Sequence, residues 1–376
     1  MHVPTGRTRL LAGLADPEDS IVNSSPWYWL LLLPVLMLVI SLTNLIFLRR
    51  PSLDSEIFTE SVVVLLPVRN EQENIPQLIQ SLKTQMGIRD LTFNFLDDNS
   101  SDQTVNLIEE HIDGDPRFTL TFGAQLPEDW LGKPFALQQA FEASDSQVVV
   151  VIDADVRLKA DALVSAITLM RSRQFSFISA YPKQIAITWA ERLIQPLLQW
   201  SWMSSVPLRI AERSHNPAFA VANGQFFIAD RAALQAVGAF ECVKMEIVDD
   251  IALARALLKN GFLGTVIDGS RIAMCRMYQS WPELREGYSK SLRVAFGSWV
   301  GSAFAITLLM LSGIAPLLLG LGGYAIIVAN RAICARATGG RIVDALLHPL
   351  SILLLTYLII RSWKMRGRTQ WKGRLV

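Results

Sequence analysis

Apolar residues are distributed unevenly along the chain, and this distribution constrains the fold more than any other feature. Residues 26–50 and 296–362 are strongly apolar, whereas residues 58–295 have the mixed polarity of a water-soluble domain. Apolar residues make up 51% of the chain, and the mean hydropathy of +0.31 is high for a soluble protein. Because about 20 apolar residues suffice to cross a bilayer, the pattern predicts a soluble-type domain held between membrane segments.

The first apolar run, residues 27–48, is long enough to span roughly 30 Å of hydrocarbon. It follows a polar segment, residues 1–25, and ends at Arg49 and Arg50. A cleaved signal peptide is the competing interpretation, but the run starts late and lacks a small-residue cleavage site. We therefore expect a transmembrane anchor at 26–50, followed by a cytoplasmic domain because of the two arginines.

Three further apolar runs lie near the C-terminus, at residues 299–319, 321–330 and 343–360. The loop between the last two is basic, and so is the tail, residues 363–376. The positive-inside rule places both basic segments in the cytoplasm, which predicts a multi-pass protein of the cell membrane. If all three runs crossed the membrane fully, the loop and the tail could not both be cytoplasmic. Either one segment is therefore re-entrant or interfacial, or the charge rule fails once.

Strand and helix signals alternate through the central domain. Short runs rich in β-branched residues predict buried strands, and apolar residues at helical spacing separate them. This alternation predicts an α/β fold with a mostly parallel sheet and helices on both faces. Such sheets bind ligands at the carboxyl ends of their strands. The expected strands are 61–67, 91–96, 118–122 and 147–152, and the expected helices are 74–86, 103–112 and 133–143.

Residues 186–212 combine several tryptophans and leucines with nearby arginines. This composition is typical of a helix that lies in the membrane interface. An ordinary core helix is an equally good interpretation.

The remaining composition excludes several classes of protein. The net charge of +1 provides no global field for nucleic acid. The three cysteines (Cys242, Cys275 and Cys334) are far apart, so no disulfide framework is expected. The four histidines lack zinc-ligand spacing.

Paired carboxylates follow two of the predicted strands. Asp153 and Asp155, separated by one alanine, follow the fourth strand and can hold one hard cation, such as Mg²⁺ or Mn²⁺, together with substrate phosphates. A solvated loop is the alternative interpretation. Asp97 and Asp98 follow the second strand and either cap the next helix or accept a hydrogen bond from a nucleobase.

A third pair, Asp249 and Asp250, opens a predicted helix. The pair can have a purely structural role, because the helix dipole stabilises acidic groups at this position. It can also have a catalytic role, as a general base that takes the proton of an acceptor hydroxyl group.

These motifs, taken in order, resemble family 2 glycosyltransferases of the GT-A fold, which is Rossmann-like with a mostly parallel sheet. The resemblance covers roughly residues 60–295. Within the family the chain looks closest to a membrane-anchored branch that includes hopanoid-associated glycosyltransferases and the carotenoid glycosyltransferase acting on diaponeurosporenoate. The matching segments are Pro67-Val68-Arg69-Asn70-Glu71, Asp97-Asp98-Asn99-Ser100, Gly132-Lys133, Asp153-Ala154-Asp155, Asn223-Gly224-Gln225 and Val248-Asp249-Asp250.

The resemblance implies roles for these residues. Asp98, with Asp97, contacts a uracil base, and Pro67, Arg69 and Glu71 line the nucleoside pocket. Asp155, with Asp153, holds Mn²⁺ or Mg²⁺ on the diphosphate, and Lys133 lies near the diphosphate or the donor sugar. Asp250 is the catalytic base and Asp249 its neighbour. The residues expected near the acceptor or the diphosphate are Gly224, Gln225, Arg276, Trp281, Arg285 and Lys290.

The chain departs from the family pattern at two positions. The family's Glu-Asp pair is Asp-Asp here, and the Q-x-x-R-W motif of processive synthases is only echoed, by residues 279–285. The predicted function is therefore an inverting transfer of one sugar from a nucleotide sugar to a membrane lipid or isoprenoid acceptor. A processive polysaccharide synthase and a non-catalytic membrane scaffold are the alternatives.

Overall fold

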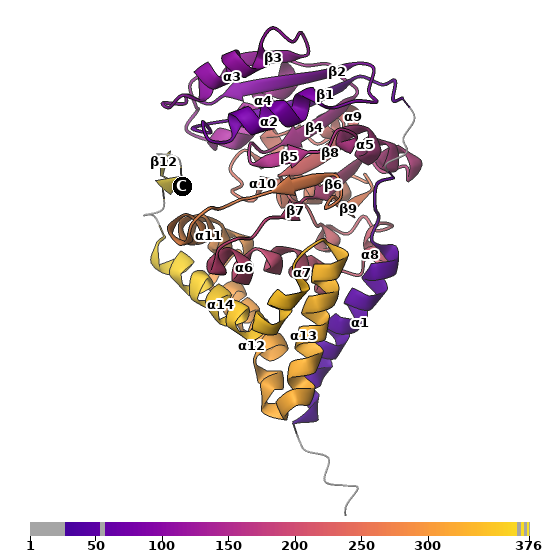
Figure 1. Ribbon diagram of the computed structural model, residues 1–376, viewed down its shortest axis with the longest axis vertical. Coiled ribbons are helices and arrows are strands. Elements are labelled where there is room, and N and C mark those ends of the chain that lie inside the picture. The colour runs from indigo at the N-terminus through magenta and orange to yellow at the C-terminus, as the bar shows by residue number, and fades with distance from the viewer. Residues whose placement is uncertain (1–26, 53–56, 367–369, 372–373, 376) are drawn as a thin grey trace, which may run out of the picture.

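The computed structural model describes residues 27–52, 57–366, 370–371 and 374–375. The polar segment 1–25 and part of the basic tail lie outside these residues. A seven-stranded sheet forms the centre of the molecule, in the order β3-β2-β1-β4-β8-β6-β9 (Figure 1). Its strands are β1 Val62–Val68, β2 Leu91–Asp97, β3 Phe118–Phe122, β4 Val148–Ile152, β6 Phe177–Tyr181, β8 Phe226–Asp230 and β9 Gly264–Asp268.

The sheet is parallel except at β8, which runs antiparallel to both of its neighbours. The central strands β1 and β4 are buried on both faces, as expected for strands with helices above and below them. The predicted α/β class and the mostly parallel sheet are thus confirmed.

Helices cover both faces of the sheet. One face packs against α2 (Ile75–Lys83), α3 (Thr104–Ile112) and α5 (Ala162–Ser172). The other packs against α4 (Gly132–Glu142), α9 (Arg231–Ala236) and α10 (Asp249–Lys259). A small second sheet lies beside the main one and consists of β5 (Val156–Leu158), β10 (Ala273–Cys275) and β7 (Lys183–Gln184).

The stretch expected as one helix at 186–212 is broken into three: α6 (Trp189–Ile194), α7 (Pro196–Ser205) and α8 (Leu208–Ala211). Proline lacks a backbone N–H and cannot continue a preceding helix, so Pro196 begins α7 and Pro207 separates α7 from α8. Trp200 and Trp202 are buried in a core between these helices and the apolar helices below them.

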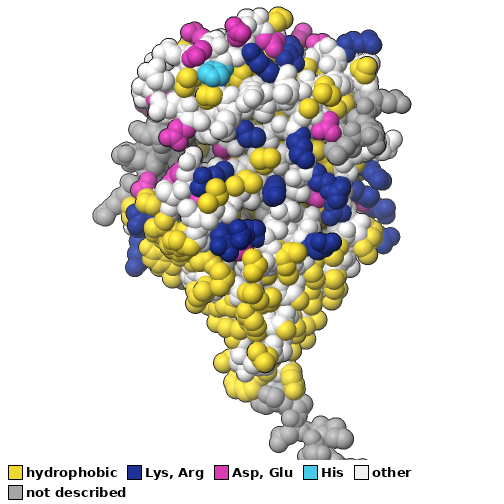
Figure 2. Space-filling model, viewed as in Figure 1, with side chains coloured by type: hydrophobic (Ala, Val, Ile, Leu, Met, Phe, Trp, Pro, Cys, Tyr) yellow, Lys and Arg dark blue, Asp and Glu magenta, His cyan; other side chains and the backbone are white. Residues whose placement is uncertain are grey.

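The apolar helices form a tapered body beneath the domain that contains the sheet, and we term this body the wedge (Figure 1). On the face seen in Figure 2, its side chains are mostly hydrophobic, and Lys and Arg side chains gather above it. Three of its helical stretches are long and apolar enough to cross a membrane: residues Tyr28–Phe47, Trp299–Ala337 and Ile342–Lys364. The elements are η1 Tyr28–Leu31, α1 Leu32–Phe47, α12 Trp299–Gly313, η4 Ala315–Leu319, α13 Gly320–Ala337, η5 Ile342–Leu347 and α14 His348–Lys364.

One amphipathic helix, α11 (Trp281–Ala295), connects the two parts of the molecule. It begins with a Ser280 side chain that accepts from the amide of Glu283, a typical N-cap. Short elements complete the described chain: η2 Pro217–Phe219, η3 Glu241–Val243, β11 Gln370–Trp371 and β12 Arg374–Leu375.

Candidate active site

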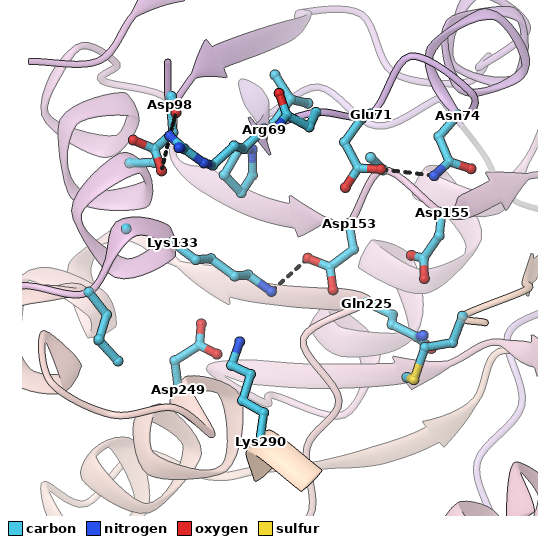
Figure 3. A pocket seen from close by; sticks show the side chains of 18 of the residues that line it. Arg69, Glu71, Asn74, Asp98, Lys133, Asp153, Asp155, Gln225, Asp249 and Lys290 are labelled. Carbon is cyan, nitrogen blue, oxygen red and sulfur yellow. Dashed lines mark hydrogen bonds and ion pairs between the residues drawn. The ribbon is translucent and has the colours of Figure 1, made fainter. Parts of the chain in front are cut away.

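A cavity of about 650 Å³ opens at the carboxyl ends of β1, β2 and β4. Parallel strands deliver their carboxyl ends to one edge of the sheet, which is where α/β proteins bind ligands. The cavity gathers eleven of the residues predicted from the sequence (Figure 3). They are Pro67, Arg69, Glu71, Asp98, Lys133, Asp153, Asp155, Gln225, Asp249, Arg276 and Lys290.

The loops after β1 and β2 build one end of the cavity. Both turn through an asparagine with positive φ, Asn70 at 51° and Asn99 at 56°, a conformation that asparagine tolerates better than most residues. Arg69 donates to the backbone carbonyl of Asp98, and its guanidinium lies 4.0 Å from the Asp98 carboxylate. Asp97 is only 4% exposed and lies outside the cavity wall, where it accepts from the amide of Ser100.

Lys133 crosses the middle of the cavity from the start of α4. Its Nζ lies 2.6 Å from Oδ1 of Asp153, and about a third of each side chain is exposed. Burial works to lower the pKa of this ammonium, but the carboxylates of Asp153, Asp249 and Asp250 outweigh it and raise the pKa well above its ordinary value. Lys133 therefore remains a permanent positive charge between two carboxylate pairs.

Asp155 has the character expected of a cation ligand. Its Oδ1 is buried and has no hydrogen-bond partner within the described part of the chain. Burial, together with the negative charge of Asp153, raises the pKa of Asp155 to about 6. Burying an unpartnered carboxylate oxygen is costly, and a divalent cation would relieve the cost.

The donor set around Asp155 is small. Among the described residues, no group of three or more His, Cys, Asp or Glu side chains is arranged to hold a metal. Mg²⁺ and Mn²⁺ commonly bind through one or two carboxylates plus substrate phosphates. The two aspartates therefore fit a cation whose remaining ligands come from the substrate.

The two carboxylates at the start of α10 point in different directions. Asp249 lines the cavity (Figure 3). Asp250 lies outside the cavity lining, where its Oδ2 accepts from the amide of Gly224 at 2.6 Å and its Oδ1 from the amide of Ile251 at 2.8 Å. Burial and the charge of Asp249 raise the pKa of Asp250 to about 6, and burial raises that of Asp249 as well.

Gly224 lies against both Lys133 and Asp250. A methyl group at this position would lie 3.1 Å from Nζ of Lys133 and 3.5 Å from Cβ of Asp250. The next residue, Gln225, is 2% exposed and is held by hydrogen bonds from Gln184 and Asn223. A side chain at 224 would therefore crowd the Lys133 ammonium group.

The remaining predicted residues lie around α11. Arg276 and Lys290 reach the cavity, and Arg276 is also paired with Glu191 at 3.3 Å. Trp281 lies outside it, with its ring 5.5 Å from that of Trp189 and 6.5 Å from that of Tyr357. The structure also places Arg285 outside the cavity lining.

Several lining residues carry no sequence signal of their own. Glu246 and Glu283 add acidic groups to the wall, and Trp130 covers one side. Cys275 lies beside Asp155, and its Sγ accepts a hydrogen bond from the side-chain Nε2 of Gln225 at 2.9 Å. A lone cysteine far from other cysteines gave no reason to expect this contact, although it immediately precedes Arg276.

Comparison with known proteins agrees with this geometry. Residues 63–238 match the family model "Glycosyl transferase family 2". The chain is 24% identical to the 4,4'-diaponeurosporenoate glycosyltransferase of Staphylococcus aureus strain bovine RF122 / ET3-1, and 23% identical to that of strain USA300. Each alignment covers 93% of this chain and 97% of the relative.

The fold is shared with a solved structure, the mannosyltransferase of Pyrobaculum calidifontis in complex with GDP-Man and Mn²⁺. The TM-score is 0.51 at 16% identity, over 90% of this chain and 100% of that one. The predicted GT-A fold and enzyme class are confirmed. Residues 63–238 therefore form a family 2 glycosyltransferase domain, and the chain is a glycosyltransferase that uses a nucleotide sugar as its donor.

Proposed function

We propose that this protein transfers one sugar, with inversion, from a UDP-sugar to a hydroxyl or carboxyl group of a membrane lipid or isoprenoid. One observation carries the proposal. Carboxylates from three strand or helix ends (Asp98, Asp153 with Asp155, and Asp249) converge on one cavity that also contains Lys133 and Lys290. A donor consists of a base, a diphosphate and a sugar. A carboxylate can accept from the base, and the lysines, together with a cation on Asp153 and Asp155, can neutralise the diphosphate.

The nucleotide occupies the end of the cavity formed by the loops after β1 and β2. Asp98 accepts from the uracil N–H, while Pro67, Arg69 and Glu71 surround the nucleoside. Asp155 and Asp153 hold Mn²⁺ or Mg²⁺, which, when bound, offsets the charge that develops on the diphosphate. The solved structure from Pyrobaculum calidifontis, described with GDP-Man and Mn²⁺, supports this choice of ion.

Asp250 acts as the base. It takes the proton of the acceptor group, whose oxygen forms a bond to the anomeric carbon from the face opposite the diphosphate. The bond from that carbon to the diphosphate oxygen breaks at the same time, and the nucleotide diphosphate leaves with the electron pair. A pKa of about 6 suits a base that works near neutral pH.

Asp249 and Lys133 assist the step through charge. Asp249 faces the cavity near Lys133 and Lys290 (Figure 3), and the charges of both lysines act on its carboxylate. Lys133 supplies a fixed positive charge to the diphosphate or the donor sugar. The assignment of the base to Asp250 rests on the family pattern, and Asp249 is the carboxylate that would replace it in this role.

The acceptor is a lipid because the cavity lies directly above the wedge. Glu283 and Lys290 line the cavity from α11, and this helix packs against α14 of the wedge. The relatives from Staphylococcus aureus are named for 4,4'-diaponeurosporenoate. We expect the wedge to insert into the cell membrane with the catalytic domain on the cytoplasmic side, because Arg49 and Arg50 follow α1.

The experiment is a donor panel assayed with purified full-length protein, Mn²⁺ or Mg²⁺, and a lipid extract. We expect release of nucleotide diphosphate from one donor, and label in a single lipid product. Asp250→Asn should retain nucleotide binding and lose transfer, whereas Asp249→Asn should keep measurable transfer. The reverse result would move the base to Asp249.

The two alternatives have distinct outcomes in the same assay. A ladder of products of increasing length would indicate a processive synthase. Failure to bind any nucleotide sugar in the presence of metal would indicate a scaffold.

A further inference from the structure

The last apolar segment of the wedge, η5 and α14, begins and ends at the catalytic domain. By length and composition it qualifies as a membrane crossing, since residues Ile342–Lys364 form 23 residues of high hydropathy. Its contacts show a different path. Near its start, Asp344 of η5 is paired with Arg192 of α6. Near its end, Ser362 is hydrogen-bonded to α11, and only the middle of the segment lies deep in the wedge.

The chain arrives at this segment from the top of α13. The carbonyl of Ala337 accepts from Arg50, which is itself paired with Asp268 at the end of β9. A methyl group at Gly339 would lie 3.3 Å from the side chain of Ser270, just after β9. The start of the segment is therefore at the level of the catalytic domain.

From there η5 descends along α13. Near its end, the carbonyl of Leu346 accepts from the hydroxyl of Tyr324 at 2.8 Å. Tyr324 lies thirteen residues before Ala337 on one continuous helix, which corresponds to about 20 Å along the axis. The segment thus turns well inside the wedge.

The helix α14 then returns to the catalytic side. At its far end, Oγ of Ser362 donates to the carbonyl of Ser289 at 2.7 Å and accepts from the amide of Arg293 at 3.0 Å, both on α11. Seventeen residues of α-helix measure about 25 Å. A helix of this length whose end is bonded to α11 cannot reach the opposite surface of a bilayer.

The side chains of α14 agree with this path. One face is exposed and apolar, with Leu350, Leu353, Tyr357 and Ile360 at helical spacing. The opposite face is buried against the protein and carries hydroxyl groups, including those of Ser351 and Ser362. Such a helix lies between lipid on one side and protein on the other, rather than among lipids all round.

Arginines surround the point of return. Arg285 and Arg293 on α11 and Arg361 on α14 each have a buried Nε without a hydrogen-bond partner among the described residues. Guanidinium groups bind phosphate esters, and the Lys and Arg side chains that gather above the wedge lie at this height (Figure 2). The arginines therefore mark the level of the phospholipid headgroups.

We propose that residues 338–364 form a re-entrant segment, which dips into the bilayer and leaves it on the side of the catalytic domain. The hairpin of α12 and α13 also returns to this side, because α11 precedes it and Ala337 ends it at Arg50. Among the described residues, only α1 then crosses the bilayer. The basic loop after α13 and the end of α14 lie on one side, as the charge rule requires, and α11 with its cavity residues is held at the membrane surface.

This inference rests on the membrane insertion proposed above, and cysteine labelling of the full-length protein in sealed vesicles tests the two separately. The native Cys242 is exposed and marks the catalytic domain, whereas Cys275 and Cys334 are buried. In a Cys242→Ser background, Arg366→Cys shows on which side of the membrane the chain lies just after α14. Trp27→Cys shows the same for the N-terminal end of α1. Lys364→Cys, also exposed, replaces Arg366→Cys if that variant fails to fold.

With a membrane-impermeant maleimide, we expect Cys242 and Arg366→Cys to label in the same vesicle orientation, and Trp27→Cys in the opposite one. Labelling of Arg366→Cys from the side opposite to Cys242 would show that α14 crosses, and would overturn the re-entrant path while leaving the proposed function intact. Labelling of Trp27→Cys from the Cys242 side would overturn the crossing by α1. Release of the protein by an alkaline wash would instead overturn membrane insertion itself.

Discussion

The catalytic domain and the wedge differ most in the side chains that they expose. In the domain, valines and phenylalanines fill the inside of the sheet and polar groups gather at one edge. On α14, Leu350 and Leu353 are exposed, although the buried face of the same helix is a mixture of apolar side chains and hydroxyl groups. Exposed apolar surface is unfavourable in water, so this difference supports the proposed insertion of the wedge into lipid.

The largest expected effect is a difference in stability between two phenylalanine substitutions, one in the catalytic domain and one in the wedge. Phe95 on β2 is fully buried, whereas Phe304 on α12 is 64% exposed. We expect Phe95→Ala to lower the free energy of unfolding by about 3–5 kcal/mol, and Phe304→Ala to change it by less than about 0.5 kcal/mol. Chemical unfolding in mixed detergent micelles measures both. An equal cost at the two sites would mean that protein, not lipid, covers α12.

The next effect concerns charge at the cavity. Asp155→Ala removes the buried carboxylate that fits the cation, so transfer should fall by at least about a hundredfold. Metal-dependent binding of the nucleotide sugar, measured by titration calorimetry, should weaken in parallel. Asp90→Ala, an exposed carboxylate in the same domain, is the matched control and should leave both unchanged. Metal-dependent binding that survived in Asp155→Ala would remove this residue from the site.

Two adjacent glycines test packing inside the wedge. A methyl group at Gly323 would lie 1.8 Å from the carbonyl oxygen of Pro316, whereas one at Gly322 would meet nothing within 4 Å. Gly323→Ala should therefore cost about 1–3 kcal/mol of stability by overpacking the turn between α12 and α13. Gly322→Ala should be neutral or slightly stabilising, since alanine favours a helix. Thermal unfolding in detergent compares them, and equal melting temperatures would contradict the close approach.

The smallest effect is a dependence on pH. The base accepts a proton only when ionised, and the pKa of Asp250 is raised to about 6. The value of kcat/KM should therefore be constant above this pH and fall as the pH drops below it, approaching tenfold per unit. A profile measured at saturating metal tests this. Activity that stayed constant down to pH 5 would argue against Asp250 as the base.

Much of the catalytic domain could be predicted from the sequence because local signals agree there. The run from Val62 to Val68 is apolar on both faces, as is typical of a strand with helices packed on both sides of its sheet. The carboxylates at 97–98 and 153–155 directly follow such strands, so their common location followed from the parallel arrangement. The segment 186–212 was less predictable, since its apolar residues and tryptophans suit an interface as well as a core.

The sequence by itself determined the α/β fold, the position of the acidic motifs and the presence of an apolar body. Tertiary structure decided which carboxylate of the pair at 249–250 faces the cavity, because this depends on the amide of Gly224 from a distant loop. It also decided the path of α14, because an apolar composition indicates that a helix is shielded from water but not where the helix begins and ends. Whether an apolar helix crosses a bilayer or returns from it depends on what holds its ends, and here those contacts are Ser362 of α14 with α11 and Asp344 of η5 with Arg192.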